Sequence, residues 1–238
     1  MRGERSMRIF QGTNVGSIRQ TNEDALFVSG NILLVADGMG GHAAGEIASS
    51  LLTKTVEQYL IDKDFINELI LKDAILSANR VILDHVNKNP SYHGMGTTAT
   101  LAYVDCNMLY YAHVGDSRLY IFRDGRLNQI TEDHSYVANL VKEGVISEEE
   151  AKHHPKKNYI LRAVGIDEKL DVDTGRCELL AQDKLLLATD GLINALEEEN
   201  IVKILSNNDI DPVDVMIKLA LKAVARDNVT AIVAMYDG

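Results

Sequence analysis

The sequence predicts an α+β protein in which β-sheets pack together and helices cover their outer faces. The order of the hydrophobic patterns supports this: a block of strands, two helices, a block of antiparallel strands, two more helices and a final strand. Size also supports it, because 238 residues, 46% of them hydrophobic, suffice for a sizeable core. The chain has three prolines and no low-complexity linker, so we expect one domain over residues 1–238.

The first half of the chain alternates between strand and helix patterns. SMRIFQGT and EDALFVSGNILLVADG predict the opening strands, with a turn at residues 29–31. Apolar residues at helical spacing predict one helix from Ala43 to about Leu60 and a second from Asp64 to about Val86. Gly96 begins a block that predicts three or four antiparallel strands, one hairpin of which turns at Asp124-Gly125.

The second half begins with a more polar segment. Residues 134–165 predict two short helices, the second of which starts with a capping box over Ser147 to Glu150. DTGRCELL and DKLLLATDG predict two strands. Further helices are predicted from Glu197 to about Leu205 and from Pro212 to about Val224, where Asp211 is the expected cap. DNVTAIVAMYD predicts the closing strand.

The composition excludes several classes of protein. A formal net charge of -11 argues against a general nucleic-acid binder, which needs a basic face. No apolar run approaches the roughly 20 residues of a membrane-spanning helix. The N-terminal residues MRGERSMRIFQGT lack the apolar stretch of a signal peptide. We therefore expect a cytoplasmic monomer that binds neither nucleic acid nor a membrane.

Five aspartates stand where a predicted buried strand meets a loop. Asp37 follows ILLVA, Asp190 follows LLLAT and Asp227 precedes NVTAIVAMY, while Asp24 and Asp116 occupy similar positions. Strand ends of one sheet can converge, and like charges in a small volume cannot all ionise without a cation between them. An oxygen-only ligand set favours magnesium or manganese over zinc.

Each of these aspartates also has a structural alternative. A single aspartate at a strand end is commonly a turn former or a helix cap. Asp37 could cap the helix near Ala43, and Asp190 could cap the segment after Gly191. The set, rather than any one member, indicates a metal site, and the residues alone leave both interpretations open.

Other motifs indicate chemistry less specifically. GMGGH precedes a helix but lacks the lysine of a Walker A loop and is not GxGxxG, so it gives little support to nucleotide binding. Arg19 could hold a phosphate or pair with Glu23 at the surface. His42 could transfer a proton or be an exposed loop residue. Ser117 and Ser135 have no triad order around them, which argues against serine-hydrolase chemistry.

Eight motifs together resemble the metal-dependent, type 2C protein serine/threonine phosphatases in their compact bacterial form. In order they are RQTNED, ADGMGGHAAGE, GTTAT, AHVGDSRLY, TEDHS, NYILRAVG, LLLATDGL and DNVTAIV, from about Val15 to Val233. The resemblance implies a four-layer α/β/β/α sandwich, in which two antiparallel sheets face each other with a pair of helices outside each. It also implies a flap at about residues 144–165 that helps to select substrates.

The resemblance further implies two divalent ions per chain, manganese or magnesium. Asp37 would bridge the ions, Asp190 and Asp227 would complete the shell of the first, and the Gly38 carbonyl would bind the second. A hydroxide bridging the ions would hydrolyse phosphoserine and phosphothreonine in proteins. The implied partners are phosphorylated proteins and a cognate serine/threonine kinase, whose action the enzyme would reverse.

The remaining site residues also take their roles from the resemblance. Asp116, together with Asp190, matches the third-ion site of bacterial members. Glu23 and Asp24 match acids that act mostly through bound waters, and Arg19 matches the arginine that grips the phosphate.

The sequence departs from the family pattern at one catalytic position. Some members carry a histidine proton donor directly after the first Asp-Gly, and Met39 stands there in this chain. A metal-bound water or His42 is left as the donor. An inactive relative that binds phosphoproteins or partners is the alternative function, and a purely structural metal protein is another. The presence of Asp37, Asp190 and Asp227 favours the active phosphatase.

Overall fold

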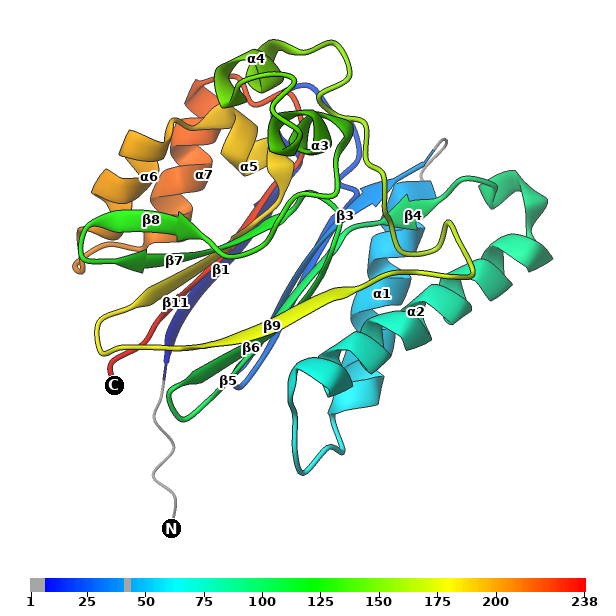
Figure 1. Ribbon diagram of the computed structural model, residues 1–238, viewed down its shortest axis with the longest axis horizontal. Coiled ribbons are helices and arrows are strands. Elements are labelled where there is room, and N and C mark those ends of the chain that lie inside the picture. The colour runs from blue at the N-terminus through cyan, green and yellow to red at the C-terminus, as the bar shows by residue number, and fades with distance from the viewer. Residues whose placement is uncertain (1–6, 41–43) are drawn as a thin grey trace.

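Two antiparallel β-sheets face each other in the computed structural model, which describes residues 7–40 and 44–238 (Figure 1). The first sheet has the strand order β1 (Arg8–Asn14), β11 (Val229–Met235), β10 (Lys184–Ala188), β7 (Arg118–Arg123) and β8 (Arg126–Gln129). The second has the order β2 (Asp24–Ser29), β3 (Ile32–Met39), β5 (Ala99–Asp105), β6 (Met108–Val114) and β9 (Asp173–Glu178), and β4 (Gly96–Thr97) also pairs with β3. These pairings confirm the predicted antiparallel α+β class.

Helices cover the outer face of each sheet, which gives the predicted four layers (Figure 1). The second sheet is covered by α1 (Ala44–Leu60) and α2 (Glu68–Lys88), and the first by α5 (Asp190–Ala195), α6 (Glu198–Leu205) and α7 (Pro212–Lys222). Two short helices, α3 (Tyr136–Lys142) and α4 (Glu148–His153), lie at the upper end of the view, and a 3₁₀ turn, η1 (Pro90–Tyr92), follows α2. Within the described residues, no helix is both long and apolar enough to cross a membrane.

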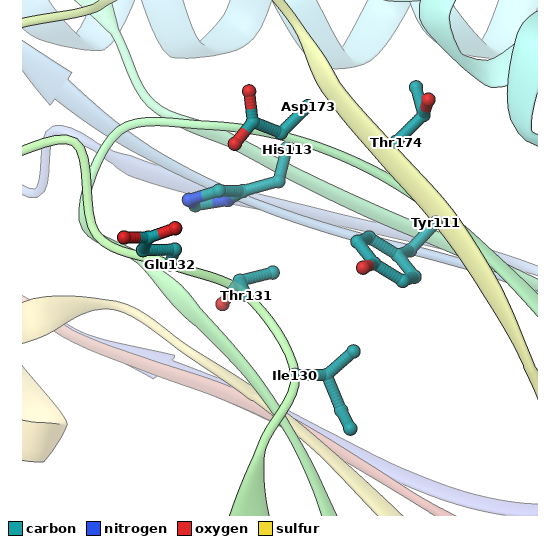
Figure 2. Close-up of a pocket in the computed structure, with 7 residues that line it drawn as sticks. All are labelled: Tyr111, His113, Ile130, Thr131, Glu132, Asp173 and Thr174. Atoms are coloured by element: carbon teal, nitrogen blue, oxygen red, sulfur yellow. The ribbon is translucent and has the colours of Figure 1, made fainter.

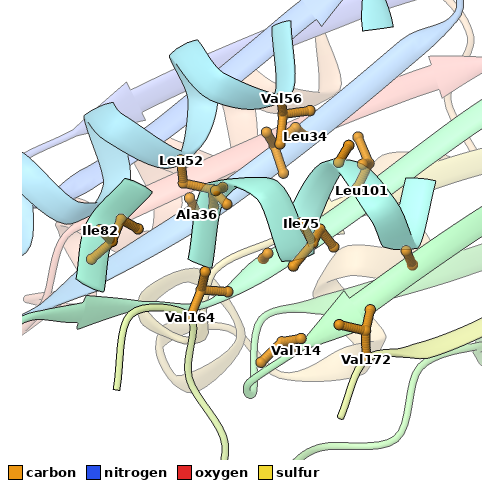
Figure 3. Close-up of a cluster of buried hydrophobic side chains, with 14 of the residues drawn as sticks. Leu34, Ala36, Leu52, Val56, Ile75, Ile82, Leu101, Val114, Val164 and Val172 are labelled. Carbon is orange, nitrogen blue, oxygen red and sulfur yellow. The ribbon is translucent and has the colours of Figure 1, made fainter. Parts of the chain in front are cut away.

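In the described part of the chain, the interior consists of three apolar clusters, one at each contact between layers. One joins α1 and α2 to the second sheet, where Leu34 and Ala36 of β3 meet Leu52 of α1 and Ile75 of α2 (Figure 3). A second joins α5, α6 and α7 to the first sheet. The third lies between the sheets and includes Leu33 of β3. Strand β3 is therefore buried on both faces, which explains its continuous apolar run.

Local capping chemistry sets several helix boundaries. The capping box of Ser147 and Glu150 and the Asp211 cap are present as predicted. The predicted start of the second helix at Asp64 is wrong, because the Asn67 side chain accepts hydrogen bonds from the main-chain N–H groups of residues 69 and 70 and the helix begins at Glu68. Helix α5 (Asp190–Ala195) was not predicted.

The segment of residues 144–165 is tied to the sheet near the end of β3. Val164 forms an isolated bridge with Thr97, and Thr97 pairs with Gly38. Ile160 of the same segment forms a second isolated bridge, with Ser135. Both bridges anchor the C-terminal part of this segment, whose role as a substrate-selecting flap stays a prediction.

Helix α7 ends in a Schellman motif that has an unusual residue at its left-handed position. The N–H of Ala225 donates to the Ala220 carbonyl over 3.0 Å, and the N–H of Val224 donates to the Leu221 carbonyl over 3.1 Å. Val224 has φ of 57°, a conformation in which glycine is usual and a β-branched side chain is strained. Its side chain is also 56% exposed, so little core packing offsets this strain.

Replacement of Val224 by glycine should therefore stabilise the fold. We expect Val224→Gly to raise the free energy of unfolding by about 1 kcal/mol, because it removes the steric cost of the left-handed conformation and loses little buried surface. Urea unfolding followed by circular dichroism measures this change. A lower free energy of unfolding for the variant would show that the valine side chain contributes packing that outweighs the strain.

Candidate metal and phosphate site

The pairing of the strands places the five predicted aspartates at one end of the sandwich. Asp24, the first residue of β2, lies opposite Asp37 near the end of β3. Ala188 at the end of β10 pairs with Ala231 near the start of β11, so the flanking Asp190 and Asp227 share an edge. Ala188 also pairs with Arg118 at the start of β7, just after Asp116. The convergence of the strand ends is therefore confirmed for both sheets.

Asp24 links the two sheets directly. Its Oδ2 accepts hydrogen bonds from Thr189 Oγ1 over 2.9 Å and from Thr230 Oγ1 over 2.6 Å, and both threonines belong to the other sheet's strand ends. Burial raises the pKa of Asp24 to about 7, although these two hydroxyl groups oppose the shift. Sequence reasoning missed both threonines because their partner is 165 and 206 positions away.

Asp37 has a fixed backbone and a carboxyl group surrounded by other acids. Its N–H donates to Thr98 Oγ1 over 2.9 Å, and its carbonyl accepts from Thr97 Oγ1 over 3.0 Å. Burial, followed by the charges of Asp24 and Asp190, raises the pKa of Asp37 well above its ordinary value. Asp37 lies within β3, six residues before the last undescribed residue ahead of α1, so it is a strand residue rather than the residue that precedes the helix.

The glycines that follow Asp37 and Asp190 permit close approach of backbone segments. A Cβ atom on Gly38 would overlap the carbonyl oxygen of Gly45 in α1, and a Cβ atom on Gly191 would overlap the carbonyl oxygen of Asn228. Both Asp-Gly pairs therefore lie where only glycine fits without rearrangement. This explains the repeated sequence pattern by packing.

Asp116 and Asp190 are destabilised as anions by their surroundings. Burial and the charge of Asp190 raise the pKa of Asp116 to about 8. Burial and the charge of Asp227 raise the pKa of Asp190, while a hydrogen bond with Asp37 and the charge of Arg118 oppose the shift. Asn194 Nδ2 donates to Asp190 Oδ2 over 3.1 Å, and Asp190 is the first residue of α5 rather than a cap before it.

Arg19 reaches into this acidic end from the loop before β2. Its Nη2 donates to Asp227 Oδ2 over 2.9 Å, and its Nη1 lies 4.0 Å from Glu23 Oε2. The structure thus shows the ion pairing of Arg19, whose main partner is Asp227 rather than Glu23, and its phosphate-binding role stays a prediction. Burial raises the pKa of the Glu23 carboxyl group, and the Arg19 charge opposes that shift.

The donor chemistry at this end fits a hard divalent cation. The side-chain atoms that could bind a metal ion here are carboxylate oxygens. Two buried ones, Asp24 Oδ1 and Asp116 Oδ1, accept no hydrogen bond from the described part of the chain. Within residues 7–40 and 44–238, however, no three acidic, histidine or cysteine side chains already have the arrangement of a metal site. The Arg19 ion pair explains part of this, because it turns the Asp227 carboxylate toward a guanidinium group.

The proton donor remains unassigned by the geometry. Met39 is the last residue of β3, pairs with Gly96 and has no titratable group. His42 lies outside the described residues.

A histidine outside the predicted set supports the backbone beside Asp116. Because His134 Nδ1 accepts from the Gly115 N–H over 3.1 Å, its proton is on Nε2, which lies 3.1 Å from Asp173 Oδ2. The His134 N–H also donates to the Gly115 carbonyl over 2.7 Å. The TEDHS motif that contains His134 was the signal for this contact.

A pocket of about 330 Å³ includes in its lining Asp173, the hydrogen-bond partner of this histidine (Figure 2). It is lined by side chains from β6, β9 and the segment after β8, namely Tyr111, His113, Ile130, Thr131, Glu132, Asp173 and Thr174. Burial lowers the pKa of His113 to about 3, so this histidine is neutral. None of the predicted metal ligands lines this pocket.

Comparison with known proteins gives a consistent match over the chain. The protein phosphatase 2C family model matches residues 12–230. The serine/threonine protein phosphatase PstP of Mycobacterium tuberculosis is 40% identical over 222 residues, which are 92% of this chain and 43% of PstP. The serine/threonine phosphatase stp of Listeria monocytogenes is 37% identical over 238 residues, which cover 94% of each chain. This chain thus spans less than half the length of one relative and nearly all of the other.

A solved structure extends the match to the fold. The catalytic domain of PstP in complex with two manganese ions superimposes with a TM-score of 0.90 at 36% identity, and covers 97% of this chain and 98% of that one.

The raised carboxyl pKa values predict an unusual pH dependence of stability in a chelator. In the folded state the pKa is about 7 for Asp24 and about 8 for Asp116, whereas the ordinary value, which applies to the unfolded chain, is 3.8. Between about pH 4 and about pH 8 the folded state therefore binds more protons than the unfolded state. Stability should therefore fall as pH rises from about 4 to about 8. At pH 8.5, Asp116→Asn should raise Tm by about 2–4 °C, because it removes a buried charge.

Differential scanning fluorimetry in EDTA across pH 5–9 measures both effects. At pH 5 the wild type and Asp116→Asn should have similar Tm values, since Asp116 is then protonated. A Tm that rises from pH 5 to pH 8, or a lower Tm for Asp116→Asn at pH 8.5, would contradict this electrostatic account.

Proposed function

The chain belongs to the protein phosphatase 2C family of serine/threonine phosphatases, and from this premise we propose that it hydrolyses phosphoserine and phosphothreonine in proteins with divalent cations. The observation that carries the proposal is the convergence of five aspartates at one end of the sandwich, four of which have raised pKa values. Such a cluster is stable in its ionised form only when positive charge is added. The manganese ions of the related PstP catalytic domain support the same chemistry.

Two manganese or magnesium ions would be held mainly by Asp37, Asp190 and Asp227, with the Gly38 carbonyl as a further oxygen ligand. Asp116, with Asp190, would contribute to a third site. Glu23 and Asp24 would act through water, which suits Asp24 because hydroxyl groups already occupy its Oδ2. When bound, the cations neutralise the phosphate dianion and lower the pKa of a water molecule that attacks phosphorus.

The residues of the chain itself bind and orient the phosphate. Arg19 is the phosphate ligand, since its guanidinium group is half-exposed and lies at the rim of the aspartates. It must first leave Asp227, and ligation of a cation by Asp227 would release it. The new P–O bond forms to the water oxygen, the P–O bond to the serine or threonine side chain breaks, and the departing oxygen takes up a proton. His42 is the proposed proton-transfer group of the chain, because Met39 has no proton to give.

The substrate class implies the proposed partners. Phosphoserine and phosphothreonine esters are made by serine/threonine kinases, so a cognate kinase and its phosphorylated products are the expected partners. The relatives named as serine/threonine phosphatases support this assignment. An inactive relative that only binds phosphoproteins is the alternative, and the presence of all five aspartates argues against it.

Hydrolysis of a phosphothreonine peptide should require a divalent cation and the Asp37 carboxylate. We expect turnover with manganese or magnesium, none in EDTA, and a loss of at least about 10²–10³-fold in kcat/KM for Asp37→Asn, because a charged ligand at the centre of the cluster is removed. Phosphate release measured with each cation tests this. Absence of turnover from folded wild-type protein with every cation would favour the phosphoprotein-binding alternative.

Arg19→Lys should separate the contribution of the guanidinium hydrogen bonds to phosphate binding from the contribution of the positive charge. We expect kcat/KM for the peptide to fall about tenfold or more, because lysine keeps the charge and loses the paired hydrogen bonds of the guanidinium group. Initial rates over a range of peptide concentrations, with saturating manganese, measure this effect. Unchanged kinetics would assign Arg19 to ion pairing with Asp227 alone.

A further inference from the structure

The loop that carries Arg19 lies against the end of α7. The Ser17 N–H donates to the Ala225 carbonyl over 2.9 Å, and Arg19 pairs with Asp227 two residues further along. The residues next to this hydrogen bond, Ile18 and Val224, are both apolar, and their exposed fractions are 63% and 56%. Two exposed aliphatic residues thus flank the hydrogen bond that joins the Arg19 loop to the end of α7.

The conformation of Val224 indicates that its side chain has a use outside the fold. The Schellman motif needs only the backbone at this position, and glycine would satisfy it without strain. Strained backbone conformations are often retained where they serve a function. The strained residue Val224 lies three residues before Asp227. The exposed side chain is therefore available to a ligand at the edge of the phosphate site.

The charge of this surface indicates what kind of ligand it receives. Arg19, Lys222 and Arg226 are all exposed on the two segments, in a chain with a formal net charge of -11. Exposed basic residues in the same two segments as the apolar pair suit a phosphorylated peptide, whose phosphate would contact Arg19.

We propose that Ile18 and Val224 form a docking surface for an apolar residue adjacent to the phosphorylated serine or threonine of a substrate. The proposal rests on the phosphatase function proposed above and adds sequence selectivity to it. Contact with Val224 and Ile18 removes apolar surface of both partners from water, which favours substrates with such a residue over those with a polar one.

Two phosphothreonine peptides that differ only in the flanking positions, leucine in one and serine in the other, test this selectivity. For the wild type we expect kcat/KM to be about fivefold higher with the leucine peptide. In Val224→Gly and Ile18→Ser this preference should fall to within about twofold, while hydrolysis of p-nitrophenyl phosphate stays unchanged. An equal preference in the wild type and both variants would overturn the proposal.

Gln182→Gly is the matched control, since Gln182 is also exposed and has φ of 76° but lies before β10, away from Arg19. Both glycine variants should raise Tm by about 2–4 °C, and only Val224→Gly should lose the preference for leucine. Loss of the preference in Gln182→Gly as well would overturn the proposal, because the effect would then come from backbone strain.

Binding measurements separate this proposal from the phosphatase function. Fluorescently labelled versions of the two peptides, with a non-hydrolysable phosphonate in place of the phosphate, should bind the manganese-loaded wild type with about a fivefold difference in Kd, and the difference should vanish in Val224→Gly. Equal affinities for the wild type would overturn the docking proposal even if it hydrolyses both phosphothreonine peptides. A difference in affinity without turnover by the wild type would support the docking surface and contradict the phosphatase function alone.

Discussion

The burial of several carboxyl groups that also repel one another is the constraint on which the rest of this structure depends. Asp24, Asp37, Asp116 and Asp190 all have raised pKa values, and burial is the largest cause for each. The fold offsets part of the cost with threonine hydroxyl donors and the charges of arginines, but two buried carboxylate oxygens accept no hydrogen bond from residues 7–40 or 44–238. The acids therefore oppose folding and favour cation binding, and the three apolar clusters must stabilise the end of the sandwich where they meet.

The pairing of the strands explains how so many acids reach one place. Antiparallel pairing places the end of one strand beside the start of its neighbour, as in β2–β3 and β10–β11, and the two sheets stack so that Asp24 contacts Thr189 and Thr230 across the layers. The same edge receives the Arg19 loop and the end of α7, which places an exposed cation and apolar side chains beside the acids. In the proposed function, phosphate hydrolysis and substrate contact thus both take place at one end of the sandwich, while the apolar core lies between the layers.

Much of the fold followed from periodicity and capping, because apolar runs and residues such as Asp211 act locally. Residue-level reasoning also found the aspartates, since strand ends are visible in the sequence. It could not find the hydroxyl partners of Asp24 or the contact of His134 with Gly115, which depend on how distant segments pack. Helix α5 has only six residues and begins with Asp-Gly, a pair that is typical of a turn. The local sequence therefore did not predict a helix there.

The central claim is that these aspartates form a cation site whose charge repulsion the metal relieves. Calorimetric titration of manganese into the metal-free protein, in two buffers with different ionisation enthalpies, tests it most directly. The account predicts saturable binding with net proton release near pH 7, because Asp24 and Asp116 are partly protonated there, and loss of tight binding in Asp37→Asn. Equal binding by the wild type and Asp37→Asn, or binding without proton release, would contradict it.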